Sequence, residues 1–179
     1  MTLSKDLILE VAGIVTDNIG TYEHHGQLSI IIQKEDIVEV CRELKENPRT
    51  SFDMLMDISG IDWYRPQNRY DVVYFLYSQE HAARVRVKVP VDERDLHIPS
   101  VVEVWEGANW YERETFDMYG IIFDGHPDLR RFYMPEDFVD PETGEPIYPM
   151  RKDFPVMGVP GALPLPPMPE RERKENVKI

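Results

Sequence analysis

The 179-residue sequence is poor in the residue types that most enzyme and membrane motifs require. It has one cysteine, Cys41, so no intrachain disulfide can form and the chain alone cannot hold a cysteine-ligated cluster. None of its ten glycines forms a dinucleotide fingerprint or a phosphate loop, and there is no Gly-x-Ser-x-Gly sequence. No window approaches the roughly 18 uninterrupted apolar residues of a spanning helix. We therefore expect any association with a membrane to be indirect.

Basic residues are also scarce. Lys and Arg total 20 against 33 Asp and Glu, which gives a formal net charge of −13. Such a charge repels phosphate backbones and anionic lipid surfaces alike, so nucleic acid is not expected as a partner. The 42% hydrophobic content is nevertheless enough for a sizeable core, and the length predicts a single globular domain.

Hydrophobic spacing divides the first part of the chain into helices and strands. Ser4 is placed to cap a first helix, and apolar residues at helical spacing predict a second helix over residues 37–44. Between them, a polar loop carrying His24 and His25 leads into a β-branched strand over residues 28–33. Because adjacent histidines rarely converge on one metal ion, we interpret the pair as part of an exposed loop.

From Phe52 onward the hydrophobic period changes to two, which is typical of strands. Met54 and Met56 are expected on the same face as Phe52. Residues 70–77 are apolar on both faces, and residues 83–89 alternate between buried and cationic positions. The pattern predicts three consecutive strands in a meander.

The third of these strands carries a basic stripe, defined by Arg84, Arg86 and Lys88 on one face. A stripe of this kind is usually a solvated face of a sheet. In so acidic a chain, the alternative is that it marks where an acidic partner docks. The pattern leaves both interpretations open.

Two capping boxes come next. Ser100 with Glu103 predicts the start of a short helix, and Asn109 with Glu112 predicts the start of a longer helix that ends at Gly120. Both predictions rest on the spacing of a polar residue and a glutamate three positions later.

The rest of the chain is rich in proline. Eleven of the fifteen prolines lie from Pro127 onward, and the stretch up to Pro169 shows no strand or helix period after Val156. We expect a domain over residues 1–155 and an extended tail over residues 156–179. The order of elements predicts an α+β fold with a mostly antiparallel sheet and helices packed on one face.

The predicted helix that ends at Gly120 carries a dense set of charges. Glu114 and Asp117 share one edge of it, and a carboxylate pair can perform acid–base chemistry if a concave site separates the two pKa values. The alternative is a charge-paired clasp, in which Arg113, Arg130 and Arg131 neutralise the carboxylates either within the chain or across a subunit boundary. We favour the clasp, because the sequence gives no sign of a catalytic site.

Two further polar groups have structural interpretations. His126 follows an Asp-Gly turn signal and is expected to stabilise that turn by a hydrogen bond. Asp57 and Asp62 flank a strand end, where capping is a simpler explanation than weak cation binding.

The charged helix and the turn after it resemble the signature of the 30 kDa subunit family of respiratory complex I, whose bacterial members are the C subunits of NADH:quinone oxidoreductase. Two shorter segments agree, DISGID over residues 57–62 and PMRKDFP over residues 149–155, so that the resemblance covers residues 28–155. The residues that carry the signature are Glu112, Arg113, Glu114, Asp117, Met118, Tyr119, Gly120, His126, Pro127, Leu129 and Arg130.

The resemblance implies a cofactor-free structural subunit of the peripheral arm, which packs against the 49 kDa-type subunit, called here the D-type subunit. FMN, the iron–sulfur clusters, NADH and quinone would then belong to the complex and its partner subunits. The complex would hold the chain at the cytoplasmic face of the inner membrane. The residues expected in the clasp and at the start of the tail are Glu112, Arg113, Glu114, Asp117, His126, Arg130, Arg131, Arg151, Lys152 and Asp153.

The sequence departs from the family pattern in three places. Phe132 stands where an aliphatic residue is common, residues 147–150 differ before Arg151, and the tail after Val159 matches no family pattern. These departures keep an alternative open, namely the equivalent subunit of a ferredoxin-linked or membrane-bound hydrogenase relative.

Overall fold

A computed structural model describes residues 3–155 and residue 158 of the chain. The predicted tail over residues 156–179 lies outside these residues, apart from Gly158. Within them, no helix combines the length and the apolar content needed to cross a bilayer.

The fold is built on a five-stranded mixed sheet with the order β1-β2-β5-β4-β3. The strands are β1 (Gly20–His24), β2 (Gln27–Ile31), β3 (Met54–Asp62), β4 (Tyr70–Ser78) and β5 (Ala83–Val91). β2 pairs with β5 in parallel, and the other three pairings are antiparallel. This confirms both the mostly antiparallel sheet and the meander of β3, β4 and β5.

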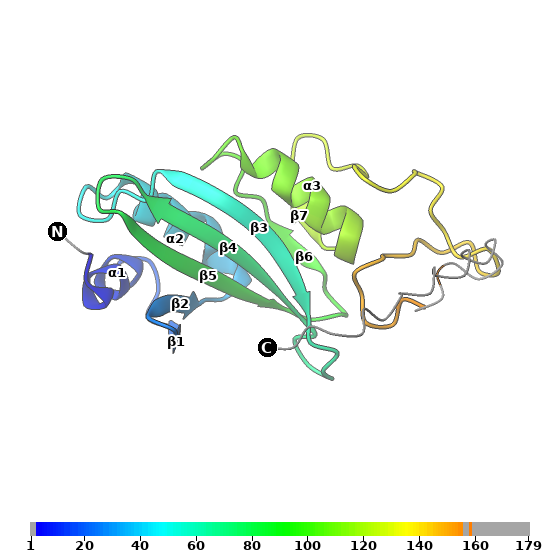
Figure 1. Ribbon diagram of the computed structural model, residues 1–179, viewed down its shortest axis with the longest axis horizontal. Helices are drawn as coiled ribbons and strands as arrows, with labels where there is room; N and C mark the ends of the chain where they lie inside the picture. The colour runs from blue at the N-terminus through cyan, green and yellow to red at the C-terminus, as the bar shows by residue number, and fades with distance from the viewer. Residues whose placement is uncertain (1–2, 156–157, 159–179) are drawn as a thin grey trace, which may run out of the picture.

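The helices cover one face of this sheet, as predicted. They are α1 (Lys5–Ala12), α2 (Ile37–Glu46), which follows the 3-10 turn η1 (Lys34–Asp36), and α3 (Ala108–Tyr119). α2 lies behind the sheet in Figure 1 and α3 lies beside β3, where it packs. A short parallel pair, β6 (His97–Pro99) and β7 (Ile122–Asp124), completes the layer.

The core forms where the sheet meets the helices. Val85, Val87 and Val89 of β5 are buried because every second side chain of a strand points to the same face. Val40 and Leu44 of α2 meet them at helical spacing. Ser4 caps α1 as predicted, since its side chain accepts a hydrogen bond from the Leu7 amide.

Three local predictions were wrong. The loop with His24 and His25 contains strand β1, whose residues are all exposed and therefore carry no hydrophobic period. Residues 101–107 form turns and not a helix. In β3 a bulge between Leu55 and Asp57 makes Met56 an extra residue, so Met54 falls out of phase with the buried Ile58, and both methionines are exposed. Phe52 is buried, but it precedes the strand.

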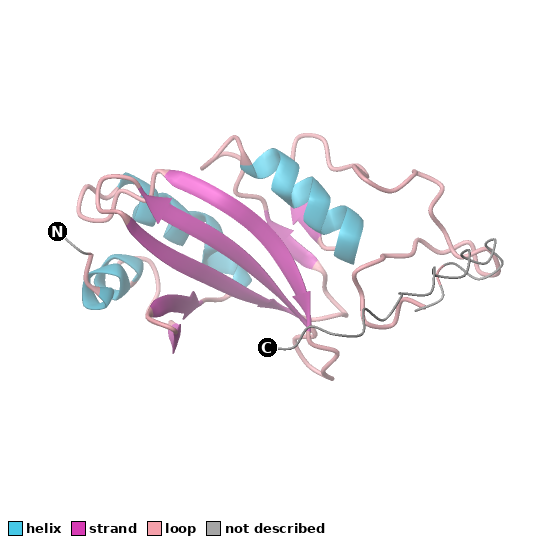
Figure 2. Cartoon of the chain, viewed as in Figure 1, coloured by secondary structure: helices cyan, strands magenta, loops and turns pink. Residues whose placement is uncertain are grey.

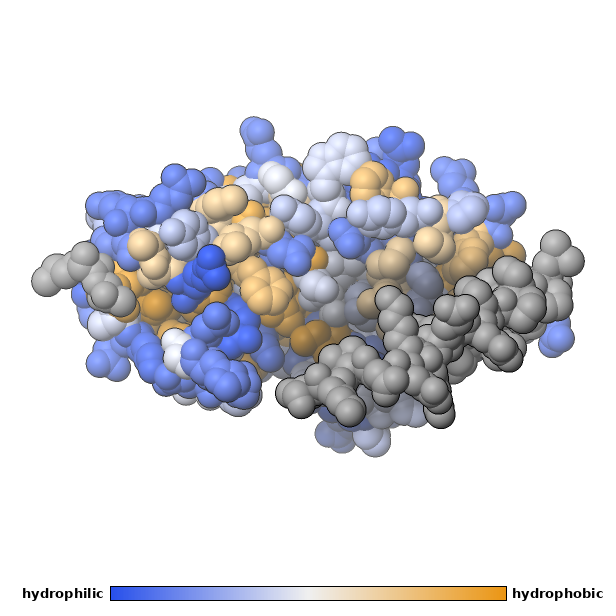
Figure 3. Space-filling view, in the orientation of Figure 1, coloured by the Kyte–Doolittle hydropathy of each residue, from blue (hydrophilic) through white to orange (hydrophobic). Residues whose placement is uncertain are grey.

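The other face of the sheet carries no helix of the described residues, and we call it the open face. It is the face toward the viewer in Figure 1, and Figure 3 shows apolar side chains gathered across it between polar ones. Tyr22, Met54 and Met56 contribute to its exposed apolar surface.

After β7 the described chain leaves regular structure. Figure 2 shows residues 125–155 as a long loop that extends beyond the end of α3. An isolated bridge between Val139 and Pro146 is the regular pairing in this segment. Some of its backbone groups bond to one another across turns, and side chains of α3 bind several of the others.

Candidate interface around helix α3

Asp117 organises the chain that follows the predicted turn. Its carboxylate is fully buried, and Oδ1 accepts a hydrogen bond from Nη1 of Arg131 at 3.0 Å. Oδ2 accepts the backbone amides of Phe132, Tyr133 and Met134 at 3.0, 2.6 and 2.8 Å. All acceptor positions of Asp117 are thus engaged in holding structure, which leaves none for acid–base chemistry.

Arg131 extends this anchor into the long loop. Its Nη2 donates to the carbonyls of Phe138 and Ile147, at 3.3 and 3.2 Å, and its guanidinium lies 5.3 Å from the Tyr148 ring centre. The ion pair of Arg131 and Asp117 is the part of the predicted clasp that forms within the chain. It fastens the loop to α3.

The other two arginines of the predicted clasp do not neutralise the carboxylates of α3. Arg113 is buried, and it donates to the carbonyls of Arg130 and Arg131 at 3.3 Å each. Its guanidinium lies against both rings of the Trp110–Phe132 pair, 5.1 and 5.3 Å from their centres. Arg130 pairs instead with Asp128, and both of these side chains are exposed. Neither arginine therefore forms an ion pair with a buried carboxylate.

Glu114 and Asp117 occupy different environments, although they share an edge of the helix. Glu114 is half-buried in a groove between α3 and β3 with Asp57 and Met118. Burial, and then the charge of Asp57, raises the pKa of Glu114. The carboxylate of Asp117, by contrast, accepts hydrogen bonds from four donors. The pair therefore does not form the two-carboxylate arrangement that a hydrolase would need.

Glu112 does not close a capping box with Asn109. It is fully buried, and its carboxylate accepts hydrogen bonds from Oγ of Ser100 at 2.6 Å and from the Val101 amide at 2.7 Å. Both predicted capping boxes are thus replaced by one contact, because Ser100 and Glu112 bind each other. Burial raises the pKa of Glu112 to about 7, against the effect of these two hydrogen bonds. Burial, followed by the Glu112 charge, also raises the pKa of the Cys41 thiol.

Replacing Glu112 by Gln is expected to flatten the pH dependence of stability. Because the pKa of Glu112 is higher in the folded state than in the unfolded state, folding favours the protonated carboxyl group. The contribution of Glu112 to stability is therefore greatest below its ordinary pKa of about 4.5, and it is lost as the pH rises to about 7. Gln keeps an acceptor for the Val101 amide and carries no charge, so the loss between pH 5 and pH 8 should shrink by up to roughly 3 kcal/mol. Urea unfolding at the two pH values measures this. Exposed Glu103→Gln is the control, and an unchanged slope in Glu112→Gln would refute the argument.

His126 stabilises its turn, as predicted. Nδ1 accepts the Asp128 amide at 3.0 Å, and Nε2 lies 3.1 Å from the carbonyl oxygen of Asn109. The ring therefore ties the turn to the start of α3.

The segment before the predicted tail is held at the far end of α3. Arg151 donates from Nε to the Tyr119 carbonyl at 2.7 Å, and its guanidinium lies 4.4 Å from the Tyr148 ring centre. Gly120 ends the helix with φ of 77°, and a Cβ there would lie 2.6 Å from Arg151 and from Tyr148. Glycine is needed both for the conformation and for the close approach.

A buried ion-pair hub, which sequence reasoning missed, completes this anchor. Arg69 is buried and binds Asp62 through two nitrogens, Nε at 3.0 Å and Nη2 at 2.7 Å. The same guanidinium reaches Asp153 at 2.9 Å and Glu93 at 2.5 Å. The amide of Lys152 also donates to Asp62, at 2.7 Å. One arginine and its partners thereby join the ends of β3, β4 and β5 to residues 152 and 153.

Asp62 is held in its charged form by this hub. Burial works to raise its pKa, but hydrogen bonds from Arg69, Lys152 and Tyr64 outweigh that effect and lower the pKa to about 2. The bond from the Tyr64 amide is the strand-end cap expected for Asp62. Within the described residues, no group of three His, Cys, Asp or Glu side chains is placed to hold a metal ion.

An exposed aromatic patch lies next to the clasp. We define this α3 patch by Trp110, Phe132 and Tyr133, which are 55%, 42% and 57% exposed. The rings of Trp110 and Phe132 are 5.2 Å apart, and those of Phe132 and Tyr133 are 4.5 Å apart. Arg113 supports the first pair from below. The buried polar contacts thus serve to present an apolar surface.

Comparisons with known proteins assign the chain to a family. Residues 30–160 match the family model described as respiratory-chain NADH dehydrogenase, 30 Kd subunit. One relative, the second NADH-quinone oxidoreductase C subunit of Rhizobium meliloti (strain 1021), is 47% identical over 146 residues, which cover 82% of this chain and 75% of the relative. The C subunit of the same enzyme from Roseiflexus sp. (strain RS-1) is 43% identical over 87% of each chain.

Two solved structures share the fold. A trypsin-resistant fragment (1-134) of Nqo5 has a TM-score of 0.59 and 33% identity, and the match covers 69% of this chain and 98% of the fragment. A chain of the membrane-bound sulfane sulfur reductase, an archaeal respiratory membrane complex, has a TM-score of 0.65 and 26% identity over 85% of this chain and 86% of its own length. Sequence and fold agree, and the chain belongs to the respiratory-chain NADH dehydrogenase 30 Kd subunit family.

Proposed function

We propose that this chain is a structural subunit in the peripheral arm of a proton-translocating NADH:quinone oxidoreductase. The observation that carries the proposal is the family match over residues 30–160, together with relatives named as C subunits of that enzyme. The site supports a structural role, because the carboxylates of Asp117 and Glu112 accept hydrogen bonds from within the chain. We infer that the chain itself carries no flavin, iron–sulfur cluster or quinone, and that partner subunits do.

The α3 patch is our candidate for the face that docks on the D-type subunit of the peripheral arm. Aromatic side chains and methionine are enriched at the centres of protein interfaces, and large exposed apolar patches are uncommon on free surfaces. Arg113 fixes Trp110 and Phe132 from the buried side, so little side-chain freedom is lost on docking. Held this way, the chain would sit at the cytoplasmic face of the inner membrane through the assembled complex alone.

A pull-down from native membranes in mild detergent tests the proposal. The wild-type chain should be recovered with the D-type subunit and an NADH-binding flavoprotein. In the double variant Trp110→Ser with Tyr133→Ser, recovery of the D-type subunit should fall at least about tenfold, since exposed aromatics at an interface centre each contribute roughly 1 kcal/mol or more.

Ile14→Ser is the matched control, because Ile14 is another exposed apolar residue, 63% exposed, at the end of α1. Thermal unfolding of each purified chain separates lost docking from lost folding. Normal recovery of the double variant would remove the α3 patch from the interface. Recovery of the wild-type chain without any respiratory subunit would overturn the proposed function itself.

A second candidate is favoured by the likeness to the sulfane sulfur reductase chain, which extends over 85% of this chain. It makes the chain the equivalent subunit of a relative that does not use NADH, such as a ferredoxin-linked or hydrogenase-type complex. The same pull-down decides, because such a complex would yield a D-type partner without the NADH-binding flavoprotein.

A further inference from the structure

The basic stripe on β5 has no acidic partner within the described residues. Several exposed cations of the described residues pair with carboxylates, as in Arg49 with Glu10 and Arg130 with Asp128. Arg84, Arg86 and Lys88 form no ion pair in the part of the chain that the structure describes. In a chain with 33 acidic residues against 20 basic ones, three successive outward cations without a carboxylate are unexpected.

The contacts of the stripe leave its charges available. Arg84 lies 5.7 Å from the Tyr77 ring centre, and Lys88 lies 5.6 Å from that of Tyr22. Arg86 donates from Nη2 to the Gln27 carbonyl at 3.3 Å, while its buried Nε has no hydrogen-bond partner among the described residues. The rings orient the side chains without neutralising them.

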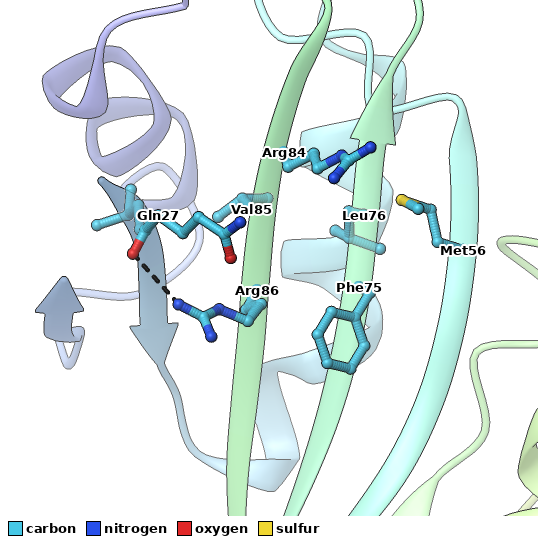
Figure 4. Close-up of a pocket in the computed structure, with 8 residues that line it drawn as sticks. Gln27, Met56, Phe75, Leu76, Arg84, Val85 and Arg86 are labelled. Carbon is cyan, nitrogen blue, oxygen red and sulfur yellow. Dashed lines mark hydrogen bonds between the residues drawn. The ribbon is translucent and has the colours of Figure 1, made fainter. Parts of the chain in front are cut away.

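A small hollow opens beside the two arginines on the open face. Its volume is about 190 Å³, and the side chains of Met56 and Phe75 form its apolar wall. Figure 4 shows Arg84 reaching across β4 toward Met56, and Arg86 pointing the other way to Gln27. No carboxylate of the described residues lines the hollow. A group that fits here is apolar and is flanked by negative charge.

We propose that the open face binds an extended acidic segment of another subunit of the complex. Side chains at alternate positions of a strand stand roughly 6.8 Å apart, so an extended chain with Asp or Glu at every second position can place its carboxylates against Arg84, Arg86 and Lys88. One apolar side chain of the segment enters the hollow. The proposal rests on the proposed function, because it requires that this chain is part of a complex.

Charge favours a protein segment over a membrane or nucleic acid. A net charge of −13 repels both of those polyanions as whole surfaces, and three cations are too few to offset it. A short segment approaches only the local stripe, within about one Debye length of it. The apolar wall next to the arginines has no counterpart in a phosphate backbone.

Zero-length carbodiimide cross-linking of the purified complex provides a direct test. The reagent joins the Lys88 amine to a carboxylate in contact with it, and mass spectrometry identifies the linked peptides. We expect Lys88 joined to an Asp or Glu of another subunit, in a peptide with acidic residues at alternate positions. Lys88 should also react with an amine reagent at least about tenfold more slowly in the complex than in the free full-length chain. Equal reactivity in both would overturn the inference.

A variant provides a second, independent readout. Neutralising the stripe with Arg84→Gln, Arg86→Gln and Lys88→Gln keeps the side-chain stems and should lower recovery of the acidic partner at least about tenfold in moderate salt. Arg94→Gln is the matched control, since Arg94 is exposed and lies outside the stripe. Undiminished recovery in the triple variant would count against the proposal.

The remaining outcomes are also decisive. Stripe-dependent sedimentation of the full chain with phosphatidylglycerol vesicles would assign the face to lipid and overturn the protein segment. If the chain assembles but Lys88 stays reactive, this inference fails and the proposed function stands. If the chain is never recovered in a complex, the proposed function fails first.

Discussion

Asp62→Asn is expected to lower the free energy of unfolding by about 3–5 kcal/mol, the range for breaking a buried ion pair by removing one partner. The Asp62 side chain is 0% exposed and that of Arg69 is 6% exposed. Asn preserves the shape, but its amide group faces the donors of Arg69 and Lys152. The guanidinium is then left buried without its main counter-charge, because Glu93 and Asp153 are themselves about half-exposed.

In the same variant, the free energy of unfolding should depend less on pH in the acidic range. The pKa of Asp62 in the folded state, about 2, lies below the pKa of an ordinary Asp. Its contribution to stability is therefore fully present when the pH is above the ordinary pKa, and it is lost as the pH falls through about 2. Urea unfolding at pH 7 and at decreasing pH measures both effects. Glu10→Gln breaks the exposed pair with Arg49 and is the control, with no measurable change expected. If Asp62→Asn were as stable as this control, the hub would have no structural importance.

Asp117→Ala is expected to be comparably severe, at about 3–5 kcal/mol, because it leaves Arg131 buried without its ion-pair partner. It also removes the acceptor for the amides of Phe132, Tyr133 and Met134. Since Arg131 holds the carbonyls of Phe138 and Ile147, the long loop should detach along with the turn. Unfolding experiments and limited proteolysis within residues 131–150 measure the two effects.

The α3 patch links this variant to assembly. Phe132 and Tyr133 are positioned by Asp117, so detachment of the loop should also reduce recovery of the D-type subunit. Asp128→Ala breaks the exposed pair with Arg130 and serves as the control for both measurements. An Asp117→Ala chain with wild-type stability and a protease-resistant loop would contradict the role assigned to this carboxylate.

The sequence was most informative where one physical constraint acts locally. The alternation in β5 predicted its buried and cationic faces, because a strand with one buried face must repeat every two residues. Similarly, the helical spacing of Val40 and Leu44 located α2, and Gly120 marked the end of α3. These features depend on neighbours within a few positions.

Errors arose where a distant partner decides the outcome. The bulge at Met56 puts Met54 out of phase with Ile58, because pairing with β4 tolerates an extra residue that no local pattern indicates. Ser100 and Glu112 had the spacing for two caps, yet each is the other's partner. Arg69 stood in no motif at all, and its partners are Asp62, Glu93 and Asp153, up to 84 positions away.

The parallel pairing of β2 with β5 sets an order on how the chain can fold. Ser29–Ile31 pair with Arg86–Lys88, which are synthesised more than fifty residues later. β3, β4 and β5 are joined in sequence by short turns and close only small loops when they pair. The hairpin of β1 and β2 is synthesised before β5 but has no sheet to join until β5 is complete. The meander is therefore the template, and the hairpin made before it must wait.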